Sequence, residues 1–262
     1  MHHHSDTVDY SRYFLLRQKI YLVNMSAERN CEIYESLSGF VTSSNRDSLE
    51  IMITHSGFGS LGNGLENKTY KLTSESMGSG IQVLADLTGA AVGNIFKFRM
   101  VGTLEMFQRR SMPRFELTTK LFQVCENTSL AFFRKEWKRI TELLRVNGAL
   151  PGFTLQETFV DLNAGGIGLM VETAKRPTPI SMFLIELNEG VTVCALAETV
   201  WEKPEEKGLR CGFRFIHILK TDQERINSHL NRLARESGGT HPDFKRNWVL
   251  VDKMVSGASK NK

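Results

Sequence analysis

Short apolar runs separated by polar breaks dominate the chain from Gly39 onward. The runs are rich in β-branched and aromatic residues, and clusters of Gly, Asn and Ser divide them at intervals of roughly 8–12 residues. The first five runs read GFVTSS, SLEIMITH, KTYKLTS, SGIQVLADLTG and NIFKFRMVGTLEMF. This pattern is typical of the strands of a small β-sandwich or barrel. The preceding residues 12–36 mix apolar and charged side chains at irregular spacing, which predicts either a short helix or a leading strand.

Two segments follow the helical period instead. The first is residues 129–147, with Thr128 or Ser129 placed to cap its start and Gly148 placed to end it. Its apolar residues recur at spacings of three and four, at Phe133, Trp137, Ile140 and Leu144. The second segment, residues 222–236, repeats this spacing at Ile226, Leu230 and Leu233. We therefore expect two amphipathic helices, the second of them near the C-terminus.

Strand-like runs also lie on both sides of the first predicted helix. RFELTTKLFQV precedes it, and ETFVDLNAGGIGLMVETA, ISMFLIEL, VTVCALAETVWEK and GLRCGFRFIHI follow it. The polar segment EKPEEKG joins the last two runs as a hairpin turn would. The pattern therefore predicts a mainly β protein with two β domains that divide near residues 104–110.

Composition is that of an ordinary globular protein. The chain has 262 residues, enough for one large domain or two of usual size, with 41% hydrophobic and 24% charged residues. A formal net charge of +4 permits an anionic ligand but does not indicate a bulk nucleic-acid binder. No apolar run approaches the length of about 20 residues that a membrane span requires. The residues His2, His3 and His4 resemble a short tag and are left out of the fold prediction.

The sequence shows no recognisable catalytic or metal-binding motif. The four cysteines are scattered without a CxxC spacing, and with no secretory signal in view we expect reduced thiols in a cytoplasmic protein. The histidines are dispersed, and neither a P-loop nor a GxSxG or strand–GxGxxG–helix motif is present. We therefore expect no enzyme activity, no metal and no cofactor.

Three arginines gather in the stretch MFQRRSMPRFEL, at Arg109, Arg110 and Arg114. Guanidinium groups this close repel one another unless an anion lies among them, and the planar arginine fork suits phosphate and guanine. Pro113 fixes its own φ and biases Met112 toward an extended form, which predicts a loop that leads into a strand. Alone, the cluster favours a solvated basic linker over a ligand site.

A second polar feature interrupts an apolar run at DLNAGGIG. Asp161 and Asn163 carry side chains that bond local backbone donors, and Gly165 and Gly166 allow positive φ and close approach of a ligand to the backbone. Alone, this feature is that of a β-turn or bulge.

Together the two features resemble the PilZ family. That family carries RxxxR followed by (D/N)xSxxG on a six-stranded antiparallel barrel, and it binds the bacterial second messenger cyclic di-GMP. The resemblance implies that Arg110 and Arg114 hold phosphates and guanine faces. It implies that Asp161, Asn163 and Gly166, with the neighbouring backbone, line the guanine side.

The resemblance also implies a domain plan. Residues 12–105 are similar in texture to the small split β-barrel that precedes PilZ in flagellar-brake proteins. Residues 106–240 would then be the PilZ domain, with a helical insertion at about 129–147 and a C-terminal helix. Arg109 matches a position where the family often carries arginine, and such members tend to bind an intercalated messenger dimer.

The sequence departs from the family pattern in two places. Asn163 stands where the family usually has Ser, although its amide can still donate and accept hydrogen bonds. The interval from Arg114 to Asp161 is long because the predicted helix lies within it. That helix either covers the barrel or presents an aromatic surface to a partner, since it carries Phe132, Phe133 and Trp137.

These features favour a non-enzymatic, cytoplasmic cyclic di-GMP receptor whose domains rearrange on binding. By family resemblance, its protein partner would belong to the flagellar motor or to exopolysaccharide machinery. An adaptor that keeps the PilZ fold but binds no nucleotide is the alternative. A single-strand nucleic-acid binder on a barrel fits less well, because the charge is modest and no strand carries a row of aromatic residues.

Overall fold

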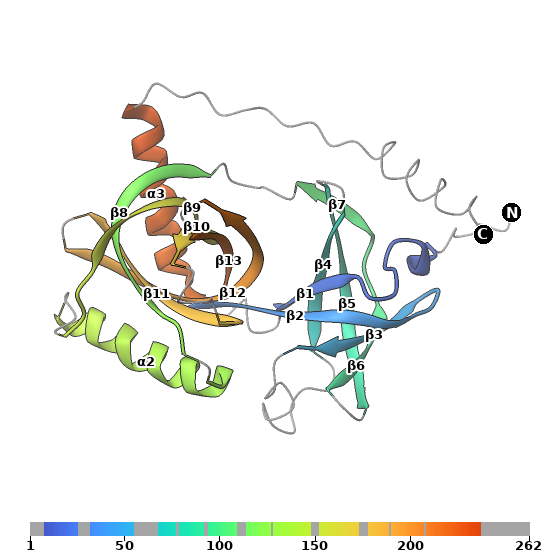
Figure 1. The fold of residues 1–262 in the computed structure, drawn as a ribbon. Coiled ribbons are helices and arrows are strands. Elements are labelled where there is room, and N and C mark those ends of the chain that lie inside the picture. Colours follow the sequence, from blue (N-terminus) through green and yellow to red (C-terminus); the bar gives the residue numbers. More distant parts are fainter. Residues whose placement is uncertain are drawn as a thin grey trace, which may run out of the picture. The chain divides into compact units, whose positions relative to one another are not determined.

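The computed structural model describes residues 8–25, 32–54, 68–76, 79–91, 94–108, 114–126, 128–147, 152–172, 178–188, 190–206 and 208–236. The described residues fall into two compact units. The N-terminal unit contains residues 8–25 and 36–108, and the C-terminal unit contains residues 32–35 and 114–236. The short segment 32–35 thus belongs to the C-terminal unit although it precedes most of the N-terminal strands. Figure 1 labels the elements of both units.

The N-terminal unit is an antiparallel β-barrel. A 3-10 helix, Tyr10–Arg12, precedes the first strand, so the leading residues contain both a helical turn and a strand. The strands are β1 (Lys19–Asn24), β2 (Ile33–Ser44), β3 (Ser48–Ile53), β4 (Thr69–Ser76), β5 (Ser79–Ala91), β6 (Ile95–Met100) and β7 (Glu105–Gln108). They pair in the order β1-β4-β5-β6-β3-β2, and a β1–β2 pairing closes the ring, while β7 adds to β5. Alternate residues such as Leu22, Ile51 and Phe98 are buried inside it.

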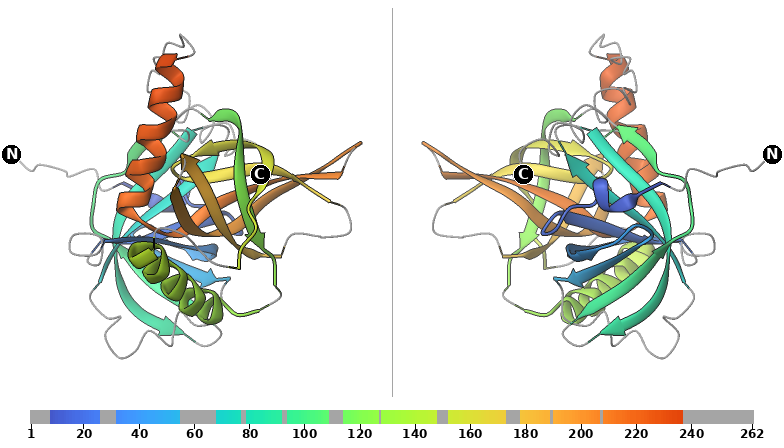
Figure 2. Two further views of the ribbon diagram at one scale, coloured as in Figure 1. Left: turned by 90° about the vertical axis from the view of Figure 1, so that its left-hand side faces the viewer. Right: turned by 90° about the vertical axis from the view of Figure 1, so that its right-hand side faces the viewer.

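The C-terminal unit is a second closed barrel of antiparallel strands, as the sequence predicts. Its described strands are β8 (Phe115–Val124), β9 (Gln156–Asn163), β10 (Gly166–Val171), β11 (Ile180–Asn188), β12 (Val191–Glu205) and β13 (Gly208–Leu219). They pair in the order β13-β10-β9-β8-β11-β12, and a β12–β13 pairing closes the ring. The last residues of β12 and the first residues of β13 form a long hairpin, in which the pairing extends to Glu205 and Gly208 (Figure 2). The first residues of β2, Ile33–Glu35, pair with β13, where Glu35 lies opposite His217.

The core of this barrel comes from alternate strand residues and from the last helix. Leu162, Ile167 and Phe213 point inward. The rings of Phe183 and Phe213 pack edge to face, with their centroids 5.0 Å apart. The helix α3 (Lys220–Glu236) adds Ile226 and other apolar residues to the same buried cluster, which confirms the predicted terminal helix. Because the inward positions are fixed in this way, the residues between them lie on the outer face of the barrel.

The helix α2 (Leu130–Asn147) covers part of the outer face of β11 and β12 (Figure 1). It begins as predicted, because the Ser129 hydroxyl accepts a hydrogen bond from the Phe132 backbone N–H at 3.2 Å. Phe133 and Trp137 are buried, and Trp137 Nε1 donates to the Cys194 carbonyl at 2.9 Å. Phe132, by contrast, is 44% exposed. Most of the aromatic content of α2 therefore packs on the barrel.

A polar cluster ties α2 to β2 and β13. The Glu35 carboxylate accepts hydrogen bonds from Arg134 of α2 and interacts with His217 Nδ1 of β13 at 3.2 Å. The His217 ring in turn lies edge-on to Trp137 at 4.3 Å. Burial acts to raise the pKa of Glu35, but its hydrogen bonds and the neighbouring positive charge outweigh burial and hold that pKa below its ordinary value.

Among the described residues, no helix is both long and apolar enough to cross a membrane.

Candidate ligand site on the C-terminal barrel

The DLNAGGIG segment forms the hairpin between β9 and β10. Asn163 and Gly166 pair across it, and Asn163 Oδ1 accepts from the Gly165 backbone N–H at 2.8 Å. The two carbonyls of the turn are anchored from other elements: Gly165 O accepts from Phe215 N of β13, and Ala164 O accepts from a side chain of α3. The turn is thus held on both sides, as a preorganised site requires.

The paired glycines do not adopt the positive φ that their residue type allows. Neither Gly165 nor Gly166 lies in the left-handed region of backbone space. Gly166 is required for a different reason: a Cβ there would lie 2.3 Å from the backbone carbonyl oxygen of Phe213. Glycine is therefore required at position 166 because β10 lies close to β13, and not because of the backbone angle at that position.

Arg114 and Asp161 form an ion pair at the start of β8. Arg114 Nη1 lies 3.1 Å from Asp161 Oδ2, with the side chains 37% and 15% exposed. The other carboxylate oxygen, Asp161 Oδ1, is buried, and no donor among the described residues bonds to it. The register explains the encounter, because Phe115 pairs with Leu162 and places Arg114 beside the end of β9. A buried acceptor without a donor is costly unless a ligand or water supplies one.

A strip of backbone without side chains lies beside Asp161. Gly168 pairs with Asp161 on one side and with Gly212 on the other, and Gly166 precedes it by two residues on the same face. We call Gly166, Gly168 and Gly212 the glycine strip. Flanked by the polar side chains of β9, it forms a flat floor on the outer face of the barrel.

The far edge of the glycine strip carries an aromatic wall that the sequence reasoning missed. Trp201 of β12 pairs with Gly212 of β13, and a Cβ at Gly212 would lie 2.1 Å from Trp201 Nε1. The half-buried indole therefore lies directly over Gly212. Arg214, opposite Gly166, occupies the same face. The apolar residues of GLRCGFRFIHI alternate with Gly212 and Arg214 and point inward. This alternation could have indicated that Gly212 and Arg214 lie on the outer face.

The structure brings together Arg114, Asp161, Asn163, Gly165 and Gly166 of the predicted set. The other two predicted residues, Arg109 and Arg110, lie outside the described residues. The described part of the chain contains no group of three or more His, Cys, Asp and Glu side chains that could hold a metal ion. The arrangement suits a flat, polar and anionic ligand: Asp161 Oδ1 can accept from its donor edge, Arg114 can balance its charge, and its ring can lie where Gly166 and Gly168 carry no side chain.

The chain is similar to several solved structures and matches one family model. Among curated proteins, none is significantly similar to the chain. The chain is similar to the Bacillus subtilis inhibitor of motility, with 12% identity over 84% of this chain and 98% of that one at a TM-score of 0.34. It is also similar to Escherichia coli YcgR in complex with c-di-GMP, with 13% identity, 90% and 96% coverage and a TM-score of 0.30. For the c-di-GMP complex of K. pneumoniae MrkH, the identity is 16%, the coverage 85% and 89%, and the TM-score 0.30.

A family model matches more specifically. The PilZ domain model matches residues 133–232, which run from α2 through β9 to β13 and into α3. This range contains Asp161, Asn163 and the whole glycine strip, while Arg114 precedes it. The C-terminal barrel of this chain is therefore a PilZ domain.

Proposed function

We propose that the chain is a receptor for cyclic di-GMP that binds the messenger on the outer face of its PilZ domain without acting as an enzyme. The observation that carries this proposal is the Arg114–Asp161 pair beside the glycine strip, with one Asp161 oxygen buried and lacking a donor among the described residues. The order of the two sequence motifs, which resembles the PilZ pattern, supports the identity of the ligand.

Guanine supplies what the Asp161 side of the site lacks. The base has N–H donors on its Watson–Crick edge, and a carboxylate only accepts hydrogen bonds. Asp161 Oδ1 can take one of these donors, which would remove the cost of its burial. Asn163 already uses its Oδ1 on the Gly165 N–H, so its Nδ2 group remains to donate. Gly166 and Gly168 carry no side chain that would block the ring, and the Trp201 indole over Gly212 bounds the space beside them.

Arg114 can supply positive charge to the phosphates at a small cost in free energy. Its pair with Asp161 uses one guanidinium nitrogen and is partly exposed, and such pairs contribute roughly 0–1 kcal/mol. A phosphate can therefore draw the guanidinium away or share it, because the fork keeps further N–H donors. Arg109 and Arg110 would join it from the preceding loop and complete a cationic clamp.

The proposed output is a change in how the two units are arranged. Three arginines per chain suit an intercalated pair of messenger molecules, whose phosphates carry more charge than one arginine balances. Binding would then alter the surface offered to a protein partner in motility or exopolysaccharide production. Small-angle scattering with and without the messenger would detect the rearrangement as a change in the distribution of interatomic distances.

Isothermal titration calorimetry with three variants tests the binding site. Asp161→Asn removes the acceptor charge and Arg114→Gln removes the cation, and each should weaken cyclic di-GMP binding roughly 10- to 100-fold. Lys120→Gln is the matched control, because Lys120 is an exposed cation of β8, the strand that follows Arg114, and pairs with Glu186 instead of Asp161. It should leave the affinity within about twofold. A ratio near two messengers per chain would support the proposed role of Arg109.

Two outcomes would overturn the proposal. One is a wild-type protein that binds no cyclic di-GMP, and the other is a Lys120→Gln variant that loses as much affinity as Arg114→Gln. Thermal melting of each variant must first show that its barrel is folded. A folded wild-type protein that binds no nucleotide would favour the alternative, a PilZ-fold adaptor that acts through protein contacts.

A further inference from the structure

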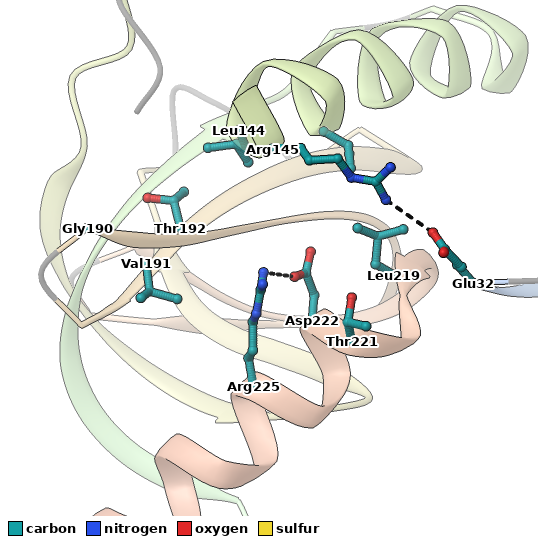
Figure 3. A pocket seen from close by; sticks show the side chains of 11 residues that line it. Glu32, Leu144, Arg145, Gly190, Val191, Thr192, Leu219, Thr221, Asp222 and Arg225 are labelled. Carbon is teal, nitrogen blue, oxygen red and sulfur yellow. Dashed lines mark hydrogen bonds and ion pairs between the residues drawn. The ribbon is translucent and has the colours of Figure 1, made fainter. Parts of the chain in front are cut away.

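A separate cavity of about 430 Å³ lies elsewhere in the C-terminal unit, between the end of α2, the start of β12 and the first turn of α3 (Figure 3). None of the residues that line it belongs to the candidate cyclic di-GMP site. Its volume falls within the range of about 300–1,000 Å³ that is usual for small-molecule sites. Arg145 of α2 and Arg225 of α3 reach into it from opposite helices, each drawn with an ion-pair partner in Figure 3.

The pair on α3 is built into the fold. Asp222 is buried, and its carboxylate accepts a hydrogen bond from Arg225 Nη1 at 2.9 Å and another from the backbone N–H of Cys194. Asp222 therefore joins the start of α3 to β12, at a position of β12 that lies just beyond its pairing with β13. Arg225 uses one nitrogen in this bond, and its side chain is otherwise largely exposed to the cavity and solvent.

The pair on α2 is loose by comparison. Arg145 Nη2 lies 3.1 Å from Glu32 Oε2, and the two side chains are 69% and 73% exposed. A pair this exposed contributes little to stability, so an anion can replace the Glu32 carboxylate at small cost. Glu32 stays beside the cavity in either case, because its backbone carbonyl accepts from Lys220 N at 2.7 Å.

The two carboxylates that line the cavity, Glu32 and Asp222, are each paired with one of its arginines, and the other surroundings suit an anion with a small organic group. The N-terminal end of α3, where the helix dipole is positive, lies at the cavity, because Thr221 and Asp222 line it. Hydroxyls of Thr141, Thr192 and Thr221 add donors, and Leu144 and Leu219 provide an apolar wall. A bare phosphate would use the arginines and leave that wall uncovered.

We infer that this cavity is a second ligand site, which binds a small phosphomonoester between Arg145 and Arg225. The phosphate takes both guanidinium groups and displaces Glu32 from Arg145. The organic group lies against Leu144 and Leu219. This inference does not depend on the proposed cyclic di-GMP site, since the two share no residue.

The inference makes opposite predictions for the two members of the exposed pair. With ribose 5-phosphate and inorganic phosphate as probes at millimolar concentration, Arg145→Gln should weaken binding about tenfold, because one charged hydrogen-bonding partner is lost. Glu32→Gln should strengthen binding, because it removes the competing carboxylate. Ribose 5-phosphate should bind more tightly than inorganic phosphate, because only the sugar covers the apolar wall.

Matched controls exist on the same helix. Arg139 and Glu136 form another partly exposed pair on α2, at 2.8 Å, and neither lines the cavity. Arg139→Gln and Glu136→Gln change the net charge by the same amounts and should leave probe binding unchanged. Chemical shift changes in a ¹⁵N–¹H spectrum of the full chain report both affinity and location.

Three results would overturn the inference. The wild-type protein could bind neither probe at millimolar concentration. The variants at Arg145 and Glu32 could behave like their controls at Arg139 and Glu136. Finally, Arg114→Gln could abolish probe binding, which would place the phosphate in the other site.

Discussion

Two neighbouring glycines at the β9–β10 hairpin should differ in how much stability they lose to the same substitution. In Gly166→Ala the new Cβ would lie 2.3 Å from the Phe213 carbonyl oxygen, closer than real contacts permit, and that oxygen belongs to backbone in a paired strand. In Gly165→Ala the nearest atom would be Asn163 Oδ1 at 3.4 Å, an ordinary contact with a side chain. Neither position has the left-handed φ that would strain alanine.

The size of the difference follows from what must move. To relieve the contact at Gly166, β10 and β13 must separate by about 1 Å within a packed barrel, and overpacking of this kind costs about 1–3 kcal/mol. We expect about 2–3 kcal/mol, because backbone moves less readily than a side chain. Gly165→Ala should lie within about 0.5 kcal/mol of the wild type, since the position is exposed.

Urea unfolding followed by tryptophan fluorescence measures both variants, because Trp137 of α2 and Trp201 of β12 both belong to the C-terminal unit. With a slope of about 1–3 kcal/mol per molar urea, the midpoint of Gly166→Ala should fall by about 1 M while the slope stays constant. A Gly166→Ala midpoint equal to that of the wild type would refute the packing argument. Equal losses in both variants would show that the turn itself, rather than the approach of β13, demands glycine.

Two further variants test how α2 is held. Trp137→Phe removes the donor to the buried Cys194 carbonyl and should cost about 1–3 kcal/mol in urea unfolding; a loss under 0.5 kcal/mol would mean that this bond contributes little. Glu35→Gln tests pH dependence: the pKa of Glu35 is held below its ordinary value of 4.5, so the stability it contributes is present above that pH and is lost as pH falls through the folded-state pKa. Unfolding free energies measured across this range should fall less steeply in Glu35→Gln, and equal slopes would exclude the effect.

Local patterns made the elements predictable. Alternation marks the strands because each barrel strand has one face in the core, and the apolar spacing marks both helices because each packs one face on the barrel. Ser129 was a cap candidate from its residue type alone, and the hydrogen bond to the Phe132 N–H confirms it. These patterns depend only on residues that lie close together in the sequence, so the sequence alone is sufficient to predict the elements.

Long-range register was not predictable, and the aromatic wall shows why. In strict alternation from the inward Ala195 and Ala197, Trp201 would also point inward. A β-bulge between Thr199 and Trp201 reverses the phase and places the indole over Gly212 on the outer face. Likewise, nothing in the alternation of β2 reveals that its first residues pair with β13 before the strand continues into the other barrel. Both features depend on which strand pairs with β12 or β2, and the local sequence does not reveal that pairing.

The first turn of α3 contacts the β9–β10 turn and also lines the second cavity, so it limits how strongly the two proposed sites can influence each other. Gln223 Nε2 donates to the Ala164 carbonyl at 3.0 Å in the β9–β10 turn, while Asp222 and Arg225, its neighbours on α3, line the second cavity. One neutral hydrogen bond contributes about 1 kcal/mol net, and a coupling free energy of that size changes affinity about fivefold. Because the coupling is reciprocal, messenger binding would alter phosphomonoester affinity by the same factor. A much larger mutual effect would therefore require movement of α3 as a whole, which its buried Ile226 and Leu230 oppose.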